Sequence, residues 1–401
     1  MKPFFNYLIA AISLVLAKNA LAVGSVSCSR SIVANVVAID QIYTYNRFGS
    51  FNPYGMIYAL RSDVVGKNGG IPGPGNAKLR SDKRPRPLVL RVNKGDCLTV
   101  NFSNWLNPTK WNSNPFAEWT RTGPILNPLN PGNLGGISGE DAPFTRTASF
   151  HINGLQPLNL ISDGSNVGKN PNSLVPPGGS AVYSFYADHE GTFFAQSMGA
   201  IAGGEGDGGS TVMGLFGAVH VEPTGSYWFR SKVSESQMDL AIKRDKLGNK
   251  ILNPDGTPQI DYYSIDPKTG KPILSILNEN EIVHSDLEAI ITGFSENSAA
   301  PSKLATGEFR EFTEIFHDEA KAVQAFDELE YDSALKGVRD GFGINYGISG
   351  AGVEIIANRR KLGPTKNCPE CKYEEFFLSS WAGGDPAMNV EKDERGRAVR
   401  A

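Results

Sequence analysis

The chain has 401 residues, with 39 Lys and Arg against 42 Asp and Glu and a formal net charge of −3. Basic patches interleaved with aromatic residues are absent from the sequence, which argues against a nucleic-acid partner. Gly-x-Ser-x-Gly and phosphate-cradling glycine motifs are also absent, which argues against the common nucleophilic hydrolases and P-loop enzymes. The 44 Gly and 25 Pro residues, spread among short apolar runs, favour β-sandwiches over helical bundles. The length allows two or three domains.

Residues 1–22 have the pattern of a secretory signal peptide. Lys2 supplies the charged region, an apolar run extends from Leu8 to Ala17, and Ala20-Leu-Ala22 offers a small-x-small cleavage site. A membrane anchor is the alternative, but polar residues interrupt the run and it is short for a span. We therefore expect export, to a periplasm or out of the cell, and no membrane span after cleavage. Cleavage removes two lysines and no acidic residue, so the exported chain is mildly acidic.

The four cysteines suit an oxidising compartment. A disulfide between Cys28 and Cys97 would attach the mature N-terminus to an early strand. Cys368 and Cys371 can form a redox pair, half of a zinc site or a local disulfide. The second ligand pair that zinc needs and the thioredoxin-like context of a redox pair are both absent from the sequence, which favours two structural disulfides.

Runs of β-branched and alternating residues predict the strands of a first sandwich. These are Ile32–Ile39, Leu88–Val92, Cys97–Phe102 and Ala181–Tyr186, the last of which follows a turn at Pro176–Gly179. Two segments rich in Gly, Pro and Asn exceed normal connection lengths, namely Gly66–Lys78 and Asn104–Asp141. We expect both to be surface loops that cover something or contact another domain.

The stretch from Thr145 to Pro223 carries the most specific pattern. Its parts are Thr145-Arg-Thr-Ala-Ser-Phe-His-Ile-Asn-Gly-Leu, then Gly191-Thr-Phe-Phe-Ala-Gln-Ser-Met-Gly, then a glycine-rich loop, and finally Gly214-Leu-Phe-Gly-Ala-Val-His-Val-Glu-Pro. In order and spacing this stretch resembles the first cupredoxin domain of multicopper oxidases, with its His-x-His-Gly strand, its His-Ser-His strand and its closing Glu-Pro. An earlier segment, Arg91-Val-Asn-Lys-Gly-Asp-Cys-Leu-Thr-Val, agrees with the family as well, with Asn101 or Asn104 closing it.

The resemblance implies copper as the cofactor, but most of the family's ligands are replaced. Ligands at positions i and i+2 of a strand share one face and can therefore share a copper cluster. Here His151 stands at the first ligand position, whereas Asn153, Gln196 and Met198 stand at three others. An amide binds copper poorly and a thioether favours Cu(I). We therefore expect His151 to be the one metal-ligand candidate of the pattern, and we expect no catalytic residue in this chain.

The resemblance also implies a reaction, the oxidation of a phenol or of a metal ion such as Mn²⁺ coupled to the reduction of O₂ to water. The narrower resemblance is to large secreted members associated with manganese oxidation. Such chemistry needs a type 1 copper and a three-copper cluster held by many imidazoles, but the chain has five histidines and no His-Cys-His. Whether it is an enzyme therefore stays open. We expect a multicopper-oxidase-like protein that is inactive alone, either a fragment or one half of an oxidase completed by a downstream polypeptide. The alternative is a non-catalytic cupredoxin scaffold that binds a partner or a single metal ion.

The predicted fold class is all-β, with tandem cupredoxin-like Greek-key β-sandwiches of which the second is incomplete. Residues 23–223 form the first domain and residues 301–401 a partial second domain. Alternating residues predict strands of the second domain at Phe309–Glu319, Gly341–Gly347 and Glu374–Trp381.

Residues 224–300 are interpreted as an elaborated linker between the two sandwiches. A capping box at Ser234–Gln237 predicts a short helix. Turn signals at Asn253–Gly256 and Asp266–Gly270 predict successive polar hairpins.

Four histidines lie outside the family pattern. We expect His189, between two acidic residues, to be a solvated turn residue and His220 to face away from the core. His284 carries no motif. His317 precedes Asp-Glu and can bind a divalent ion, although packing at a strand end is favoured.

The glycine-rich loop Gly203–Gly209 contains Glu205 and Asp207. Two carboxylates on a flexible backbone can bind Ca²⁺ or Mn²⁺ with help from carbonyl groups. Such a loop more often simply lets the backbone turn, and this is the favoured interpretation.

Overall fold

The computed structural model describes residues 26–41, 55–83, 85–108, 146–199, 209–231, 233–294 and 308–321, together with short strands at 43–44, 50–52, 301–302, 323–324, 340–345, 378–379, 391–392 and 398–399. The predicted signal peptide, most of the loop Asn104–Asp141, the carboxylates Glu205 and Asp207, and the pair Cys368 and Cys371 lie outside these residues. Within these ranges, no helix is both long enough and apolar enough to cross a membrane.

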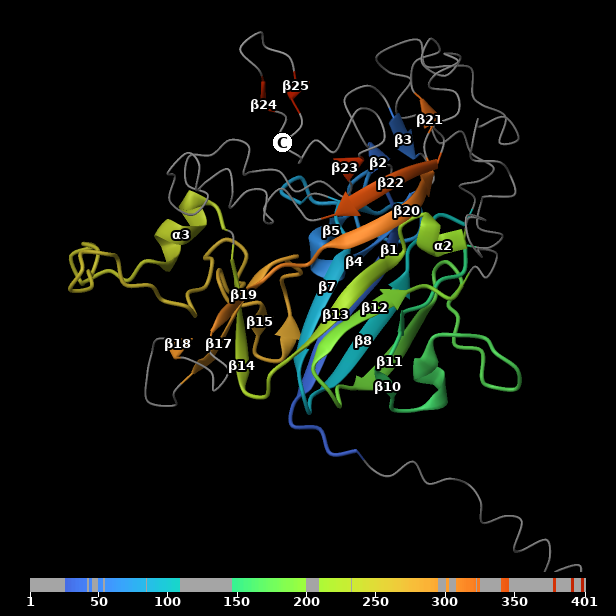
Figure 1. Ribbon diagram of the computed structural model, residues 1–401, viewed down its shortest axis with the longest axis horizontal. Coiled ribbons are helices and arrows are strands. Elements are labelled where there is room, and N and C mark those ends of the chain that lie inside the picture. Colours follow the sequence, from blue (N-terminus) through green and yellow to red (C-terminus); the bar gives the residue numbers. More distant parts are fainter. Residues whose placement is uncertain are drawn as a thin grey trace, which may run out of the picture.

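Two sheets in the centre of the molecule form a β-sandwich (Figure 1). The first sheet has the order β10–β11–β8–β1–β16–β15, with β4 also paired to β1. Its strands are β10 (Gln156–Pro157), β11 (Ser180–Tyr186), β8 (Cys97–Asn104), β1 (Ser31–Asp40), β16 (Glu281–Ile282), β15 (Leu277–Asn278) and β4 (Met56–Leu60). The second sheet has the order β7–β13–β12–β9. Its strands are β7 (Leu88–Asn93), β13 (Phe216–Glu222), β12 (Gly191–Gln196) and β9 (His151–Ile152).

Neighbouring strands in these sheets come from distant parts of the chain. β1 and β8 run parallel, as do β13 and β7, whereas β11 with β8 and β12 with β13 are antiparallel. Parallel neighbours need crossover connections, so the chain alternates between the two sheets as in a Greek-key sandwich. The predicted all-β class is confirmed, and the predicted runs at Ile32–Ile39, Leu88–Val92 and Cys97–Phe102 each lie within one of these strands.

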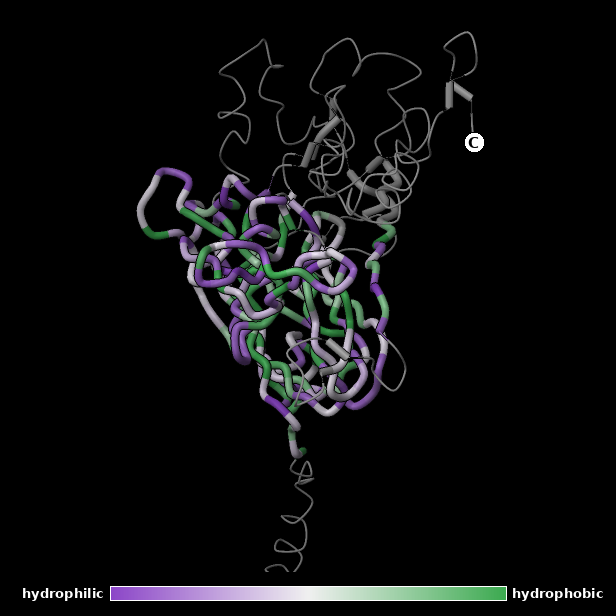
Figure 2. Tube along the Cα trace, turned by 90° about the vertical axis from the view of Figure 1, so that its left-hand side faces the viewer, coloured by the Kyte–Doolittle hydropathy of each residue, from purple (hydrophilic) through white to green (hydrophobic). Residues whose placement is uncertain are grey.

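The core forms because successive residues of a strand point to opposite faces. On β1, Ile32, Ala34 and Val36 enter the main apolar cluster between the two sheets, while Val37 and Ile39 enter a second cluster on the outer face. Burial of such a side chain contributes about 2 kcal/mol to folding. Figure 2 shows the apolar segments concentrated within the described body and the polar segments towards its loops.

Cys28 and Cys97 form a disulfide, the pairing that the sequence predicts. Cys97 begins β8 and lies opposite Ser31, the first residue of β1. The bond therefore fixes the segment before β1 at the edge from which two central strands start.

The segment after Pro223 adds strands to the body. β14 (Ser226–Arg230) pairs with β17 (Ala289–Phe294), and β16 pairs with β1 of the first sheet. Between them, α3 (Glu235–Ala241) starts with the predicted capping box, since Ser234 and Gln237 bond each other's backbone reciprocally. The predicted turns follow, with Gly256 and Gly270 at positive φ. This part extends to the left in Figure 1.

One predicted strand is wrong in its extent. The run Phe309–Glu319 forms two strands, β19 (Phe309–Glu311) and β20 (Ile315–Lys321), which belong to different sheets. β19 pairs with β17, and β20 pairs with β22 (Asp340–Asn345). The alternating sequence does not reveal the break, because tertiary partners on two sides compete for it.

The predicted strands Gly341–Gly347 and Glu374–Trp381 correspond to β22 and to the shorter β23 (Leu378–Ser379), which pair with each other. The remaining short elements are β2 (Tyr43–Thr44), β3 (Ser50–Asn52), η1 (Arg61–Asp63), β5 (Val64–Val65), β6 (Lys78–Leu79), η4 (Leu160–Asp163), α2 (Gly209–Val212), β18 (Pro301–Ser302), β21 (Val323–Gln324), β24 (Glu391–Lys392) and β25 (Ala398–Val399).

Candidate metal centre

The antiparallel pairing of β9 with β12 places the family's ligand positions next to one another. His151 lies directly opposite Gln196 in this ladder, and the backbone N–H of Asn153 continues it by donating to Phe194. The frame inferred from the sequence pattern is thus present at the β9 edge of the second sheet.

The imidazole of His151 is occupied on both nitrogens by oxygen atoms of the chain. Nε2 lies 2.9 Å from Oδ1 of Asn153, and Nδ1 lies 2.5 Å from the carbonyl oxygen of Asp163. The carboxylate of Asp163 is 3.6 Å from Nδ1, and Ser165 donates to it. A copper ion at His151 would therefore have to displace one of these partners.

The other two substituted positions supply no imidazole. The side-chain oxygen of Gln196 accepts a hydrogen bond from Thr211, and the backbone N–H of Met198 donates to the hydroxyl of Ser149. Among the described residues, no second imidazole joins His151 in a metal-binding group. The copper that the resemblance implies does not fit these residues.

A different group of polar side chains lies on the outer face of the same sheet. Thr192 of β12, His220 of β13 and Arg91 of β7 are directly opposite one another in the ladder, and Glu222 follows two residues along β13 on the same face. Val219 and Val221, between them in sequence, enter the sandwich core. His220 thus faces away from that core, but it is only 5% exposed because later segments of the chain cover it.

His220 is held by two hydroxyl groups and approaches one carboxylate. Nδ1 lies 2.9 Å from Oγ1 of Thr192, and Nε2 lies 2.9 Å from Oγ1 of Thr313. Oε2 of Glu311 is 3.5 Å from Nδ1. Burial lowers the pKa of His220 to about 4, although Glu311 opposes the shift, so the ring is neutral at pH 7 and one nitrogen keeps its lone pair.

Arg91 neutralises Glu311 from the opposite side. Its side chain is fully buried, and both Nε and Nη2 donate to Oε1 of Glu311, at 2.9 and 2.5 Å. The guanidinium also donates to the backbone oxygens of Asp286 and Leu287. Burial alone would raise the pKa of Glu311, but Arg91 reverses this and the pKa lies below its ordinary value. Glu311 is therefore ionised.

Glu222 is the unusual member of the group. It is buried, and its Oε1 has no hydrogen-bond partner among the described residues. Burial, together with the bonded Glu311 carboxylate, raises the pKa of Glu222 to about 9. Without a cation, Glu222 therefore carries a proton at neutral pH, and the two carboxyl groups share a hydrogen bond.

A pocket of about 320 Å³ opens at this group. His220, Glu222 and Glu311 line it. The other residues in its walls include Glu190, Thr192, Pro223 and Phe309. The ligand atoms that His220, Glu222 and Glu311 offer lie within 4.8 Å of one another. Sequence reasoning missed this group, although Val-His-Val-Glu carried the same i and i+2 signal that marks ligands in the family pattern.

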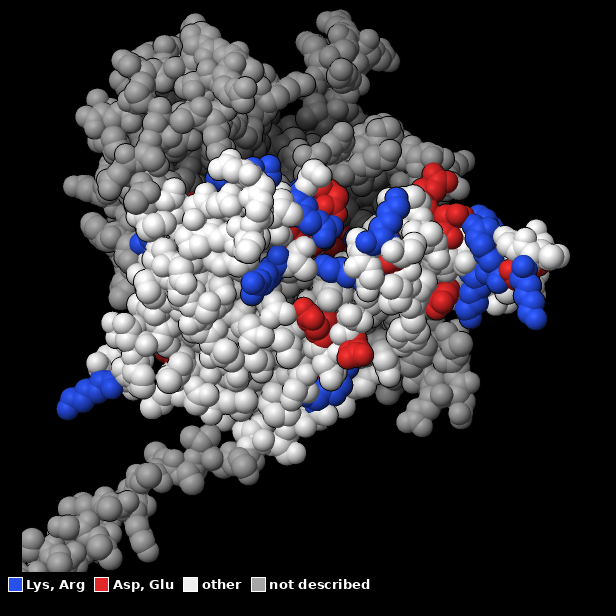
Figure 3. Space-filling view, turned by 180° about the vertical axis from the view of Figure 1, so that it is seen from behind, with Lys and Arg blue, Asp and Glu red and all other residues white. Residues whose placement is uncertain are grey.

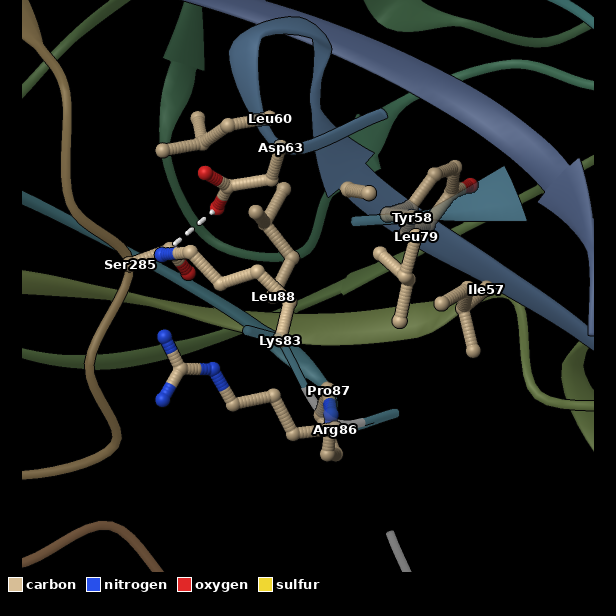
Figure 4. Close-up of a pocket in the computed structure, with 11 residues that line it drawn as sticks. Ile57, Tyr58, Leu60, Asp63, Leu79, Lys83, Arg86, Pro87, Leu88 and Ser285 are labelled. Carbon is tan, nitrogen blue, oxygen red and sulfur yellow. Dashed lines mark ion pairs between the residues drawn. The ribbon is translucent and has the colours of Figure 1, made fainter. Parts of the chain in front are cut away.

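A second pocket, shown in Figure 4, is structural. Its volume is about 20 Å³, which is room for about one water molecule. Lys83 is 3.2 Å from Asp63, and Arg86 is 3.0 Å from Asp286. Lys83 and Arg86 are thus both paired with acidic residues of the chain.

The remaining histidines form no such group among the residues whose side chains the structure describes. His189 is exposed beside Asp188, as expected for a turn residue. His284 is buried, with Nε2 2.7 Å from the carbonyl oxygen of Pro272. The side chain of His317 lies outside the described residues. On the face seen in Figure 3, acidic and basic side chains are interspersed beside a broad uncharged area.

No protein-family model matches the sequence, and no curated protein matches it. Similar solved structures include a multicopper oxidase from Pseudomonas thermotolerans (17% identity, 48% of this chain and 30% of that chain, TM-score 0.27). They also include a copper nitrite reductase from Nitrosomonas europaea (15% identity, 48% and 42%, TM-score 0.25) and the multicopper oxidase mgLAC (14% identity, 58% and 52%, TM-score 0.26). The chain spans about a third to a half of the length of these structures. The similarities are distant, they extend over about half of this chain, and they say nothing about its chemistry.

Proposed function

We propose that this chain is an exported, cupredoxin-like protein of the multicopper-oxidase type that is not an oxidase by itself. The observation that carries the proposal is the state of His151, whose two ring nitrogens lie within hydrogen-bond distance of Asp163 and Asn153. The positions where the family carries further imidazoles hold Asn153, Gln196 and Met198. The chain then serves as a rigid scaffold. Oxidation of a phenol or of Mn²⁺ with O₂ would need copper ligands from another polypeptide.

The topology supports the cupredoxin-like fold in this proposal, and the disulfide supports export. A sandwich in which β1 and β8, and likewise β13 and β7, run parallel agrees with the resemblance inferred from the sequence. The Cys28–Cys97 disulfide suits a protein that folds outside the reducing cytosol.

Copper loading tests the scaffold. The purified chain is incubated with Cu²⁺, dialysed and analysed by mass spectrometry for metal and by absorption for a blue-copper band. We expect no blue band and no copper that depends on His151. A matched triple variant, Asn153→His, Gln196→His and Met198→His, restores the family's imidazoles and is expected to gain copper. Copper bound by the unaltered chain and lost in His151→Ala would overturn the proposal.

Export is tested by sequencing the N-terminus of the protein recovered from outside the cytoplasm of a secreting host. Cleavage after Ala22 predicts a chain that starts at Val23. A chain that keeps Met1 and sediments with the membrane would mean an anchor instead.

A further inference from the structure

The carboxyl group of Glu222 is buried in a way that a purely structural role does not explain. It is 3% exposed, yet its Oε1 has no hydrogen-bond partner within the described part of the chain. A buried carboxyl oxygen without a partner costs about 1–3 kcal/mol or more. Glu222 lines the pocket, so a ligand bound there would supply the missing partner of this oxygen.

We propose that His220, Glu222 and Glu311 bind a single divalent transition-metal ion such as Zn²⁺ on the outer face of the second sheet. Three protein ligands that leave further positions open are the arrangement of metal sites that accept water or another small ligand. This inference goes beyond the proposed function, because the site uses none of the family's ligand positions.

The proposed site at His220 and the family's ligand position at His151 lie at different places along β12. His151 is opposite Gln196, whereas His220 is opposite Thr192, four residues earlier. At about 3.3 Å per residue, the two sites are about 13 Å apart along β12, and they also lie on opposite sides of this strand, on β13 and β9. An ion at one site therefore does not share ligands with the other.

The side chains around His220 and Glu311 are arranged as ligand supports. Nε2 of His220 is held by the hydroxyl of Thr313, while Nδ1 faces both the hydroxyl of Thr192 and Oε2 of Glu311. A metal ion at Nδ1 would take the place of the Thr192 hydroxyl. A metal-binding histidine normally has such a partner on its other nitrogen, because the partner fixes the ring. The two oxygens of Glu311 also have different partners, since Oε1 accepts from Arg91 while Oε2 faces His220.

The charges of the group permit one divalent ion. Arg91 already balances Glu311, so the ion would be balanced by Glu222 and in part by Glu190, which lines the same pocket. Glu222 and Glu311 are in contact, so a metal ion between them would take the place of the proton that the two carboxyl groups share, and that proton would be released. Two ligands of one Zn²⁺ lie at most about 4.2 Å apart. The ligand atoms of this group lie within 4.8 Å of one another, so small side-chain rotations bring them to one ion.

The donor set selects the kind of ion. One imidazole and two carboxylates suit Zn²⁺ and its first-row neighbours, whereas Cu(I) prefers the sulfur ligands that this group lacks. Ca²⁺ takes six to eight oxygen ligands, more than two carboxylates and a hydroxyl of Thr192 supply. The pocket of about 320 Å³ leaves room for water molecules to complete the coordination.

Zn²⁺ binding to the full exported chain tests the site, by titration calorimetry and by metal analysis after dialysis. We expect about one equivalent to bind to the unaltered chain, and Glu222→Gln and His220→Gln each to weaken binding more than about tenfold. Glu222→Gln keeps a side chain that can donate to Glu311, so it preserves the fold. His189→Ala, which removes an exposed histidine elsewhere, is the matched control and should bind as the unaltered chain does.

Co²⁺ provides a readout that needs no variant. Its visible absorption bands are expected to appear on binding and to disappear when Zn²⁺ displaces it. Absence of Zn²⁺ binding to the unaltered chain would overturn the site. Zn²⁺ binding by Glu222→Gln and His220→Gln that is as tight as in the unaltered chain would overturn it as well. Because His151 takes no part, copper retained there would refute the proposed function and leave this site standing.

Discussion

Arg91 and Glu311 join two distant parts of the chain, since two guanidinium N–H groups donate to one carboxylate oxygen. Arg91 is fully buried on β7, and Glu311 comes from β19, in the segment that covers the second sheet. The pair therefore attaches this segment to the sandwich and orients the second oxygen of Glu311 towards His220.

Replacing Glu311 with Ala should be strongly destabilising. It leaves the Arg91 guanidinium buried without its counter-ion, and the loss of one partner of a buried pair costs about 3–5 kcal/mol. We expect urea unfolding of Glu311→Ala to show a free energy of unfolding lower by about 3 kcal/mol.

The pair Arg80 and Asp82 supplies the control, because it is also a close ion pair but is exposed to solvent. Asp82→Ala should change the free energy of unfolding by less than about 1 kcal/mol. Equal effects of the two substitutions would mean that Arg91 finds another partner or water when Glu311 is lost.

Asn104 should matter far more than Asn101, the other asparagine that the sequence offers to close the β8 motif. Asn104 is fully buried, donates to the backbone oxygens of Arg146 and Val175, and accepts from the N–H of Leu106. Asn104→Ala leaves these groups unsatisfied, so we expect a loss of about 3 kcal/mol.

Asn101→Ala is the matched control. Asn101 lies on the exposed side of β8, where its side chain bonds Asn35. Thermal unfolding of the two variants should therefore separate them clearly. A similar shift in melting temperature for both would show that the buried network adjusts around the lost amide.

The disulfide should contribute much of the stability of the first sheet. Cys28 and Cys97 are separated by 69 residues, and closing a loop of this length stabilises a fold by about 4 kcal/mol in the chain-entropy account. The double variant Cys28→Ala and Cys97→Ala should lose about that amount in urea unfolding. Unaltered protein treated with a reductant should match it, and a difference between the two would indicate a cost of the new alanines themselves.

The strands of the sandwich could be predicted because their patterns are local. β1 is a run rich in β-branched residues and β8 alternates apolar with small or polar residues. The pairing of Cys28 with Cys97 follows from compartment and position. The ligand frame at β9 and β12 was found through its spacing. The replacement of the family's imidazoles is also visible in the sequence, at Asn153 and Gln196.

The sequence predicts only a part of the group formed by His220, Glu222 and Glu311. The i and i+2 placement of His220 and Glu222 is a sequence signal, but their partners are not. Glu311 reaches them because the chain leaves β19 at Phe312, and the alternating run Phe309–Glu319 hides that break. Arg91 lies among the apolar residues Leu88–Val92 of β7, and its buried partners cannot be inferred from its neighbours in sequence.

Acid should remove a stabilising contribution of His284 between about pH 6.5 and pH 4. His284 is buried, with Nδ1 unpartnered among the described residues, and burial followed by the charge of Arg230 lowers its pKa to about 4. In the unfolded chain the pKa returns to about 6.5, so the unfolded state binds more protons between these values. The stabilisation is complete above about pH 6.5 and is lost towards pH 4, by about 3 kcal/mol. Urea unfolding across this range should show a smaller loss in His284→Gln than in the unaltered chain, and parallel pH profiles for the two proteins would mean that water reaches the ring in the folded state.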